Sequence, residues 1–93
     1  MRPVVRLGDM CSGHQCWPPR PSTSGAVATF NDHKPIHRVS DSWAIHCCSG
    51  CHIGIMASGS PTFFVENKPV ARIGDPINCG SFAATGSTDL FTN

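Results

Sequence analysis

Four side chains that can bind a metal ion stand at spacings that suggest one shared site. His14 and His46 each lie five residues after an aspartate, and Cys79 lies four residues after another. We take His52, the last residue of the segment HCCSGCH at 46–52, as the fourth ligand. Three imidazoles and one thiolate suit a closed tetrahedral zinc site. The sequence therefore predicts one structural Zn²⁺ bound by His14, His46, His52 and Cys79.

Other cysteines leave alternatives for one of these ligands. The chain holds six cysteines, and five of them flank or adjoin the predicted histidine ligands: Cys11, Cys16, Cys47, Cys48 and Cys51. Adjacent Cys47 and Cys48 are sterically unsuited to bind one ion together. A zinc ribbon needs two Cys-x₂-Cys pairs, and this chain has one, Cys48 to Cys51. The start of the chain lacks the apolar stretch of a secretory signal, and cytosolic thiols stay reduced, so we expect metal binding rather than disulfides.

The spacing of the ligands follows from a motif that occurs three times. It reads PVVRLGD at 3–9, PIHRVSD at 35–41 and PVARIGD at 69–75. In a second element after each copy, a glycine precedes a phenylalanine by five residues: SGAVATF at 24–30, SGSPTFF at 58–64 and TGSTDLF at 85–91. A period near 30 residues is typical of one supersecondary unit used three times. Because one unit cannot bury its own apolar face, the three must pack together, and equivalent positions then meet near one axis.

The repeat predicts one small domain of three units, at about 1–31, 32–67 and 68–93. Nine glycines, eight prolines and the lack of a sustained helical apolar period indicate an all-β fold with many turns. The segments FNDHKP and FVENKP predict hairpins. The Gly-Asp of the motif predicts a turn with positive φ. Ser40 replaces this glycine in the middle copy, where it would carry about 1 kcal/mol of strain.

The remaining aromatic, histidine and charged side chains are assigned structural roles. One phenylalanine per repeat is expected to anchor the core: Phe30, Phe64 and Phe91. Trp17 and Trp43 lie in the two loops that carry the first two histidine ligands, and we expect them to shield the metal. His33 and His37 are expected to be exposed in a hairpin. The regular recurrence of the motif arginines and aspartates indicates a structural ion-pair network rather than catalysis.

Composition excludes several classes of function. A formal net charge of +1 gives no strong electrostatic attraction to nucleic acid. No apolar run approaches the roughly 18 residues of a membrane span. The nucleotide-binding, serine-hydrolase and metalloprotease motifs are absent. The one glutamate, Glu66, does not lie near the predicted ligands, which disfavours a zinc hydrolase. We therefore expect no enzymatic activity.

The repeated Pro-x-x-Arg resembles the Pro-Ala-Ala-Arg signature of the PAAR-repeat family. PVAR at 69–72 and PVVR at 3–6 match it most closely, PIHR at 35–38 is more divergent, and the similarity covers essentially the whole chain. The resemblance implies a small pointed cone of pseudo-threefold symmetry, without an appended effector domain. It also implies a metal site near the tip, made of three histidines and one cysteine: His14, His46, His52 and Cys79.

The resemblance further implies a role and partners. Family members sit on the blunt end of a trimeric β-helical spike, either the VgrG spike of the type VI secretion system or the central spike of a contractile phage tail. We expect one chain to cap and sharpen one trimeric membrane-puncturing spike, and to be able to present effector cargo. We expect assembly in the cytoplasm and delivery out of the cell with the spike. The alternatives are a small zinc-binding interaction module, a zinc hydrolase and a disulfide-stapled extracellular domain.

Overall fold

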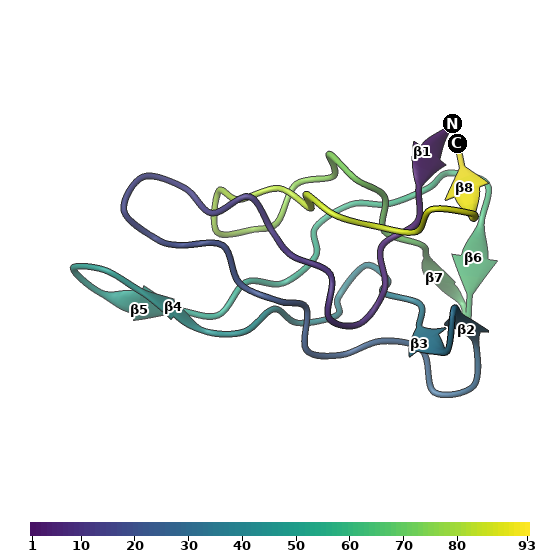
Figure 1. Ribbon diagram of the computed structural model, residues 1–93, viewed down its shortest axis with the longest axis horizontal. Helices are drawn as coiled ribbons and strands as arrows, with labels where there is room; N and C mark the ends of the chain where they lie inside the picture. The colour runs from purple at the N-terminus through teal and green to yellow at the C-terminus, as the bar shows by residue number, and fades with distance from the viewer.

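The computed structural model describes residues 1–93 and contains no helix. Eight two-residue strands pair into four antiparallel sheets: β1–β8, β2–β3, β4–β5 and β6–β7 (Figure 1). Their bounds are β1 Arg2–Pro3, β2 Phe30–Asn31, β3 Lys34–Pro35, β4 His46–Cys47, β5 Cys51–His52, β6 Phe64–Val65, β7 Lys68–Pro69 and β8 Phe91–Thr92. The predicted hairpins FNDHKP and FVENKP form β2–β3 and β6–β7, and the all-β prediction is confirmed. The structure has no helix that is long and apolar enough to cross a membrane.

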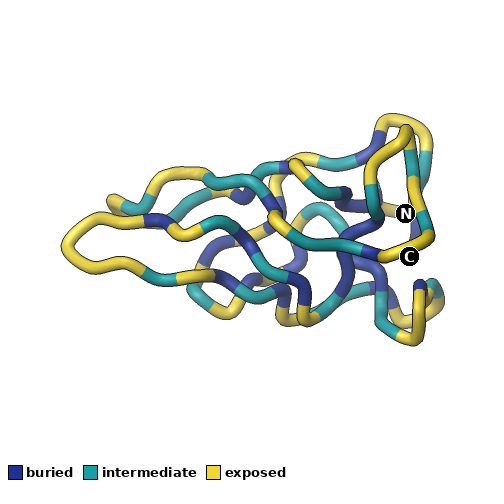
Figure 2. Tube along the Cα trace, turned by 90° about the horizontal axis from the view of Figure 1, so that it is seen from below, coloured by how far each residue is buried: buried dark blue, intermediate teal, exposed yellow.

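The molecule tapers along its longest dimension. Its principal extents are 37 × 24 × 22 Å, and it narrows toward one end (Figure 2). Three of the sheets, β1–β8, β2–β3 and β6–β7, lie at the wide end, which we call the base (Figure 1). The β4–β5 hairpin lies at the narrow end, the tip. The chain runs from the base toward the tip and back three times, which agrees with a cone built from three repeats.

Backbone hydrogen bonds join the repeats in rings around a pseudo-threefold axis. In one ring the N–H of Val5 donates to Ala71 (3.0 Å), that of His37 to Val5 (2.9 Å) and that of Ala71 to His37 (3.0 Å). A second ring has the donors Leu7, Val39 and Ile73 and the acceptors Pro35, Pro69 and Pro3. His37 thus occupies the axis position and is 0% exposed, so the prediction that His37 is exposed is wrong. In the repeat, His37 is equivalent to Val5 and Ala71, which are both fully buried. This equivalence could have predicted the burial of His37 from the sequence.

The core consists of two apolar clusters. One contains Val5, Cys11, Trp43, Met56, Ala71, Ile77 and Ala83. The other contains Val4, Ala26, Ile36, Val65 and Val70. The three equivalent phenylalanines belong to neither, because Phe30, Phe64 and Phe91 are 55%, 55% and 43% exposed. The prediction that they anchor the core is therefore wrong. Side chains alternate across a strand, and in β6 and β8 the inward position is taken by the following residue, Val65 or Thr92.

The Gly-Asp turn of the motif has the same backbone geometry in all three copies. Gly8 has φ of 90°, Gly74 has φ of 91° and Ser40 has φ of 79°. The N–H of Ser40 donates to the carbonyl of Met56 at 3.0 Å, as that of Gly74 donates to Ala83 at 2.8 Å. The prediction that this position needs a positive φ is confirmed. Because L-residues other than glycine disfavour this region, Ser40 holds a strained backbone conformation.

Candidate metal centre

Two of the predicted ligands face each other across the β4–β5 hairpin. The strand register pairs His46 with His52 and Cys47 with Cys51. Successive side chains point to opposite faces of a strand, so His46 is buried while its neighbour Cys47 is exposed. The Nε2 atoms of His46 and His52 lie 2.5 Å apart. One hairpin thus supplies two imidazoles at one point.

His14 and Cys79 reach the same point from the other two repeats. His14 lies in a tight turn that two backbone hydrogen bonds with Trp17 close, at 3.0 and 2.8 Å. Its Nε2 atom is 3.2 Å from Nε2 of His52. The Sγ atom of Cys79 is 3.8 Å from Nε2 of His46. The structure therefore brings together the four residues that the sequence singled out, with one ligand atom from each within 4.8 Å of all the others.

The spacing of this group, which we call the tip cluster (His14, His46, His52 and Cys79), suits a tetrahedral metal ion. Zinc–ligand bonds of about 2.0–2.3 Å separate ligand atoms by about 3.3–3.7 Å at tetrahedral angles. The distances of 3.2 Å and 3.8 Å lie close to that range. The His46–His52 pair would open slightly around an ion. Three nitrogens and one sulfur are ligands that zinc prefers, so these residues fit a closed zinc site.

Hydrogen bonding and packing orient the ligands. Nδ1 of His46 lies 2.9 Å from the carbonyl oxygen of Pro18, so Nδ1–H donates there and Nε2 keeps its lone pair for a metal. Burial, together with the nearby imidazoles of His46 and His14, lowers the pKa of His52 and favours its neutral, metal-binding form. A Cβ on Gly54 would lie 3.2 Å from Sγ of Cys79 and 2.7 Å from Ile77, so glycine leaves the room that the thiol occupies.

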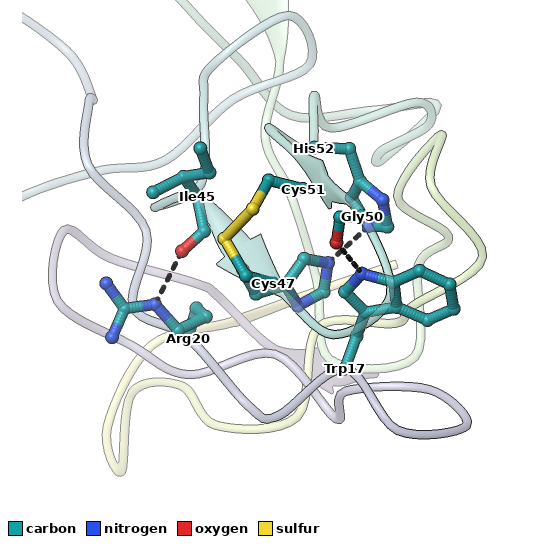
Figure 3. The surroundings of a disulfide bond; sticks show 8 residues. Trp17, Arg20, Ile45, Cys47, Gly50, Cys51 and His52 are labelled. Carbon is teal, nitrogen blue, oxygen red and sulfur yellow. Dashed lines mark hydrogen bonds between the residues drawn. A yellow bond between two sulfur atoms is a disulfide. The ribbon is translucent and has the colours of Figure 1, made fainter.

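Of the two tryptophans, only Trp17 packs against the ligand rings, stacked on His14 and tilted against His52. Its ring lies 5.0 Å from that of His14 and 5.2 Å from that of His52, measured between centroids. Its indole N–H donates to the carbonyl of Gly50 at 2.9 Å (Figure 3). Trp43 is instead buried in the core, with its ring 4.8 Å from that of His37. Trp17 therefore packs against the tip cluster as expected, whereas Trp43 belongs to the apolar cluster on which Cys79 packs.

The cysteines that competed as ligands are engaged elsewhere. Disulfides join Cys16 to Cys48 and Cys47 to Cys51, and Figure 3 shows the second of these bonds on the β4–β5 hairpin. Cys11 is buried in the core and is a free thiol, as is Cys79. The expectation of metal binding rather than disulfides is therefore wrong for the four disulfide-bonded cysteines, and Cys79 is the one cysteine that lies in the tip cluster. The cross-strand register of Cys47 and Cys51 gave rise to this pairing, and the sequence alone could not reveal it.

The motif arginines and aspartates form the expected structural ion pairs. In each repeat the guanidinium binds the aspartate three residues later, at 3.0 Å for Arg6–Asp9 and 2.9 Å for Arg38–Asp41. Burial alone would raise the pKa of Asp9, but the hydrogen bonds from Arg6 outweigh it and leave that pKa lowered. The same balance lowers the pKa of Asp41. These aspartates stay ionised, as a structural network requires.

Sequence reasoning missed a second acid in two of these networks. Nη1 of Arg6 donates to Asp32 at 3.0 Å, and Nη1 of Arg38 donates to Glu66 at 3.1 Å. Both acids occupy hairpin turns at the base, two residues after Phe30 and Phe64, and this shared offset was the available signal. Glu66 also accepts two backbone N–H groups, at Val27 and Ala28. Glu66 therefore stabilises the backbone and the Arg38 side chain at the base, and it lies apart from the tip cluster.

Three β repeats around one axis, with a His₃Cys group that could hold a metal ion where their loops meet, define a class of small tapered β proteins. The chain belongs to the PAAR motif family, whose sequence pattern matches residues 12–84. It is also 31% identical over 74 residues to the double-stranded DNA deaminase toxin A of Burkholderia cenocepacia (strain H111). That alignment covers 75% of the present chain and 5% of the toxin's length. The similarity thus concerns the repeat unit and a small part of the larger protein.

Proposed function

We propose that this chain caps and sharpens the blunt end of a trimeric β-helical spike, with its base against the trimer and its tip pointing away. The observation that carries the proposal is the base itself. Three equivalent hairpins lie there around the pseudo-threefold axis, and each presents one exposed phenylalanine: Phe30, Phe64 and Phe91. Three matched contacts on one chain suit three identical subunits of one partner.

The exposure of these aromatic rings supports docking at the base. Soluble proteins seldom leave several large apolar side chains exposed on one face without a partner. A trimeric β-helix ends in unpaired strand edges, which invite aggregation unless another chain covers them. The short hairpins of the base can pair with such edges through the backbone, while the phenylalanines provide apolar contact. The partner proposed here is therefore one spike trimer per chain, of the VgrG or phage-tail kind.

The tip cluster supports the second half of the proposal. We propose that it binds one structural Zn²⁺ and that the ion ties the loops of all three repeats to one apex. A structural zinc ion supplies on the order of 10 kcal/mol in small domains. Small domains have a thin hydrophobic margin and often need such a staple. The bound ion would stiffen the point that first meets a barrier.

The proposal also includes the domain organisation of the chain and its location in and outside the cell. We propose that residues 1–93 act as one structural unit of three repeats, without catalysis and without affinity for nucleic acid or a stable membrane anchor. The unit would assemble on its spike in the cytoplasm and leave the cell with it, with or without effector cargo. A net charge of +1 supports the lack of affinity for nucleic acid, and the position of Glu66 at the base, away from the tip cluster, supports the non-enzymatic assignment.

The test mixes the purified chain with homotrimeric spike proteins and measures mass by light scattering. We expect a complex of three spike subunits and one chain. Replacing the three basal phenylalanines with serine should weaken binding by at least about tenfold, as loss of buried aromatic anchors does. The matched control replaces three similarly exposed apolar residues toward the tip: Ile45, Ile53 and Phe82. A homotrimer of the chain alone, a 3:3 complex, or equal losses in both variants would contradict the proposal.

A further inference from the structure

The three arginine networks at the base are equivalent by the repeat but are not equally filled. We call each network a corner. The first contains Arg6, Asp9 and Asp32, and the second contains Arg38, Asp41 and Glu66. The third, the open corner, contains Arg72, Asp75 and Arg2. The first two corners each hold one guanidinium and two carboxylates, whereas the open corner holds two guanidiniums and one carboxylate.

Hydrogen bonds identify the unfilled position. In the first two corners Nη1 donates to a carboxylate of the hairpin turn, at 3.0 Å for Arg6 and 3.1 Å for Arg38. Arg72 donates to Asp75 through Nε at 2.9 Å and Nη2 at 2.8 Å, and its Nη1 has no hydrogen-bond partner. The Arg72 side chain is only 11% exposed. Nη1 is not among the fully buried atoms without a partner, so this edge of an otherwise buried guanidinium can be reached from solvent and favours an incoming anion.

The cause lies in how the third hairpin is built. Asp32 and Glu66 each lie two residues after the strand phenylalanine, in the turn of a continuous hairpin. The third hairpin pairs β8 with β1, two segments that are distant in sequence. Its equivalent position, two residues after Phe91, is Asn93, whose side chain is neutral. Asp75 is the only acid within ion-pair distance of Arg72.

The loop beside the open corner is already satisfied, which leaves Arg72 as the group that needs an anion. The hydroxyl of Ser60 accepts the N–H groups of Thr62 and Phe63 at 3.1 and 3.0 Å. Ser87 does the same for the equivalent loop beside the first corner. The open corner differs from the first corner in three ways: it has no carboxylate equivalent to Asp32, it contains Arg2, and Arg72 has no bond like that from Nη2 of Arg6 to the carbonyl of Gly86. The geometry of Arg6 with Asp32 therefore describes the missing contact.

The net charges of the three corners also indicate that the open corner lacks a second carboxylate. The first two corners each sum to −1, from one guanidinium and two carboxylates. The open corner sums to +1, because Nη1 of Arg2 also lies 3.4 Å from Asp75 and adds a second guanidinium. We propose that the open corner is a carboxylate-binding site and that it receives an Asp or Glu side chain from the trimeric partner. The source of that carboxylate rests on the proposed function, whereas the site itself does not.

The first experiment tests the site in the isolated chain. Asn93→Asp places an acid at the position equivalent to Asp32, and it should raise Tm by about 2–4 °C, the shift expected from one partly buried ion pair in a domain of this size. The gain should vanish in the Arg72→Gln background. Ser49→Asp, at an exposed position near the tip, adds the same charge as a control and should leave Tm unchanged. Equal Tm values for Asn93→Asp and wild type would overturn the site.

An acetate titration followed by NMR gives an independent measure of the same site. The side-chain Nε–H signal of Arg72 should shift saturably with acetate, while those of Arg6 and Arg38, whose Nη1 groups already have acids, should not. Uniform small shifts in all three arginines would mean non-specific screening and would overturn the proposal.

The second experiment tests the source of the carboxylate. With a spike trimer that binds the wild-type chain, Asn93→Asp should be more stable yet bind about five- to tenfold more weakly, because the introduced acid fills the corner that the partner needs. A stabilised variant with unchanged affinity would overturn the partner as the source. If no spike trimer binds the wild-type chain, the proposed function fails, and the Tm and NMR measurements still decide the site.

Discussion

His46 lies directly opposite His52 across the β4–β5 hairpin, so one hairpin supplies half of the tip cluster. The next register position is the pair of Cys47 and Cys51, which form a disulfide. Because side chains alternate along the strands, the imidazoles face inward and the sulfurs face outward. The hairpin is thus covalently closed on one side and ready to bind a metal on the other.

Loss of a single cluster residue should destabilise the protein strongly. Protein purified without a nickel column should contain about one zinc per chain, as a closed site requires. Cys79→Ala or His14→Ala should lower Tm by more than 10 °C, since about 10 kcal/mol of metal binding is at stake. His33→Ala, at an exposed position outside the cluster, is the control. Equal effects in all three variants, or full stability of the metal-free protein, would contradict the ligand assignment.

The disulfides should be measurable independently of the metal. Alkylation of the denatured protein without a reductant should label two thiols, those of Cys11 and Cys79. The Cys16–Cys48 bond spans 32 residues, and a loop of that length predicts about 4 kcal/mol of stabilisation. Cys16→Ser should therefore lower the free energy of unfolding by up to about that amount. Six labelled thiols and no effect of reductant on Tm would show that the bonds do not form in solution.

Ser40→Gly should stabilise the protein by about 1 kcal/mol, because glycine adopts the positive φ of this turn without strain. The matched reverse change is Gly8→Ser. A Cβ on Gly8 meets nothing within 4 Å, so its cost arises from the backbone conformation alone. Urea denaturation of the three proteins measures both effects. Equal stabilities would mean that surrounding contacts remove the strain.

Acid should destabilise the core through His37. Burial lowers the pKa of His37 below its ordinary value near 6.5, although a hydrogen bond to the carbonyl of Ser24 partly opposes the shift. The unfolded chain therefore binds a proton at His37 more readily than the folded chain. This contribution to stability is fully present above about pH 6.5 and is lost as the pH falls below it.

The variant His37→Val, which copies the equivalent Val5, removes this proton uptake. The difference in unfolding free energy between wild type and variant should shift in favour of the variant between pH 7.5 and pH 5. Metal loss in acid affects both proteins alike and drops out of the difference. A difference that stays constant over this range would show that His37 does not titrate on unfolding.

The repeat register predicted the tip cluster because equivalent positions converge on an axis. His14 and His46 share one offset from the motif aspartate, and Cys79 differs from it by one residue. His52 needed an extra assumption, since it is set by strand pairing with His46 rather than by the repeat. The disulfides depend on the same pairing, so sequence spacing alone could not predict them.

Errors arose where side-chain orientation decided burial. Phe30 is apolar but points out of a two-residue strand, and hydrophobicity alone does not say which face of such a strand is buried. His37 is polar but occupies an axis position that its repeat equivalents Val5 and Ala71 fill with small apolar groups. For His37 symmetry was a better guide than residue type, whereas for the three equivalent phenylalanines it gave no information on which face of the strand is buried. Applied strictly, it would have placed His37 correctly.

The pairing of β1 with β8 has a topological consequence. Joining residues 93 and 1 by a short turn like Asp32–His33 would make the backbone a closed ring of three similar hairpins. The ring could then be cut at the turn after β2 or after β6, and the hydrogen bonds around the axis would not change. Circularly permuted chains should therefore fold. Each of the three basal turns is a point where foreign sequence can be attached while the tip is left untouched.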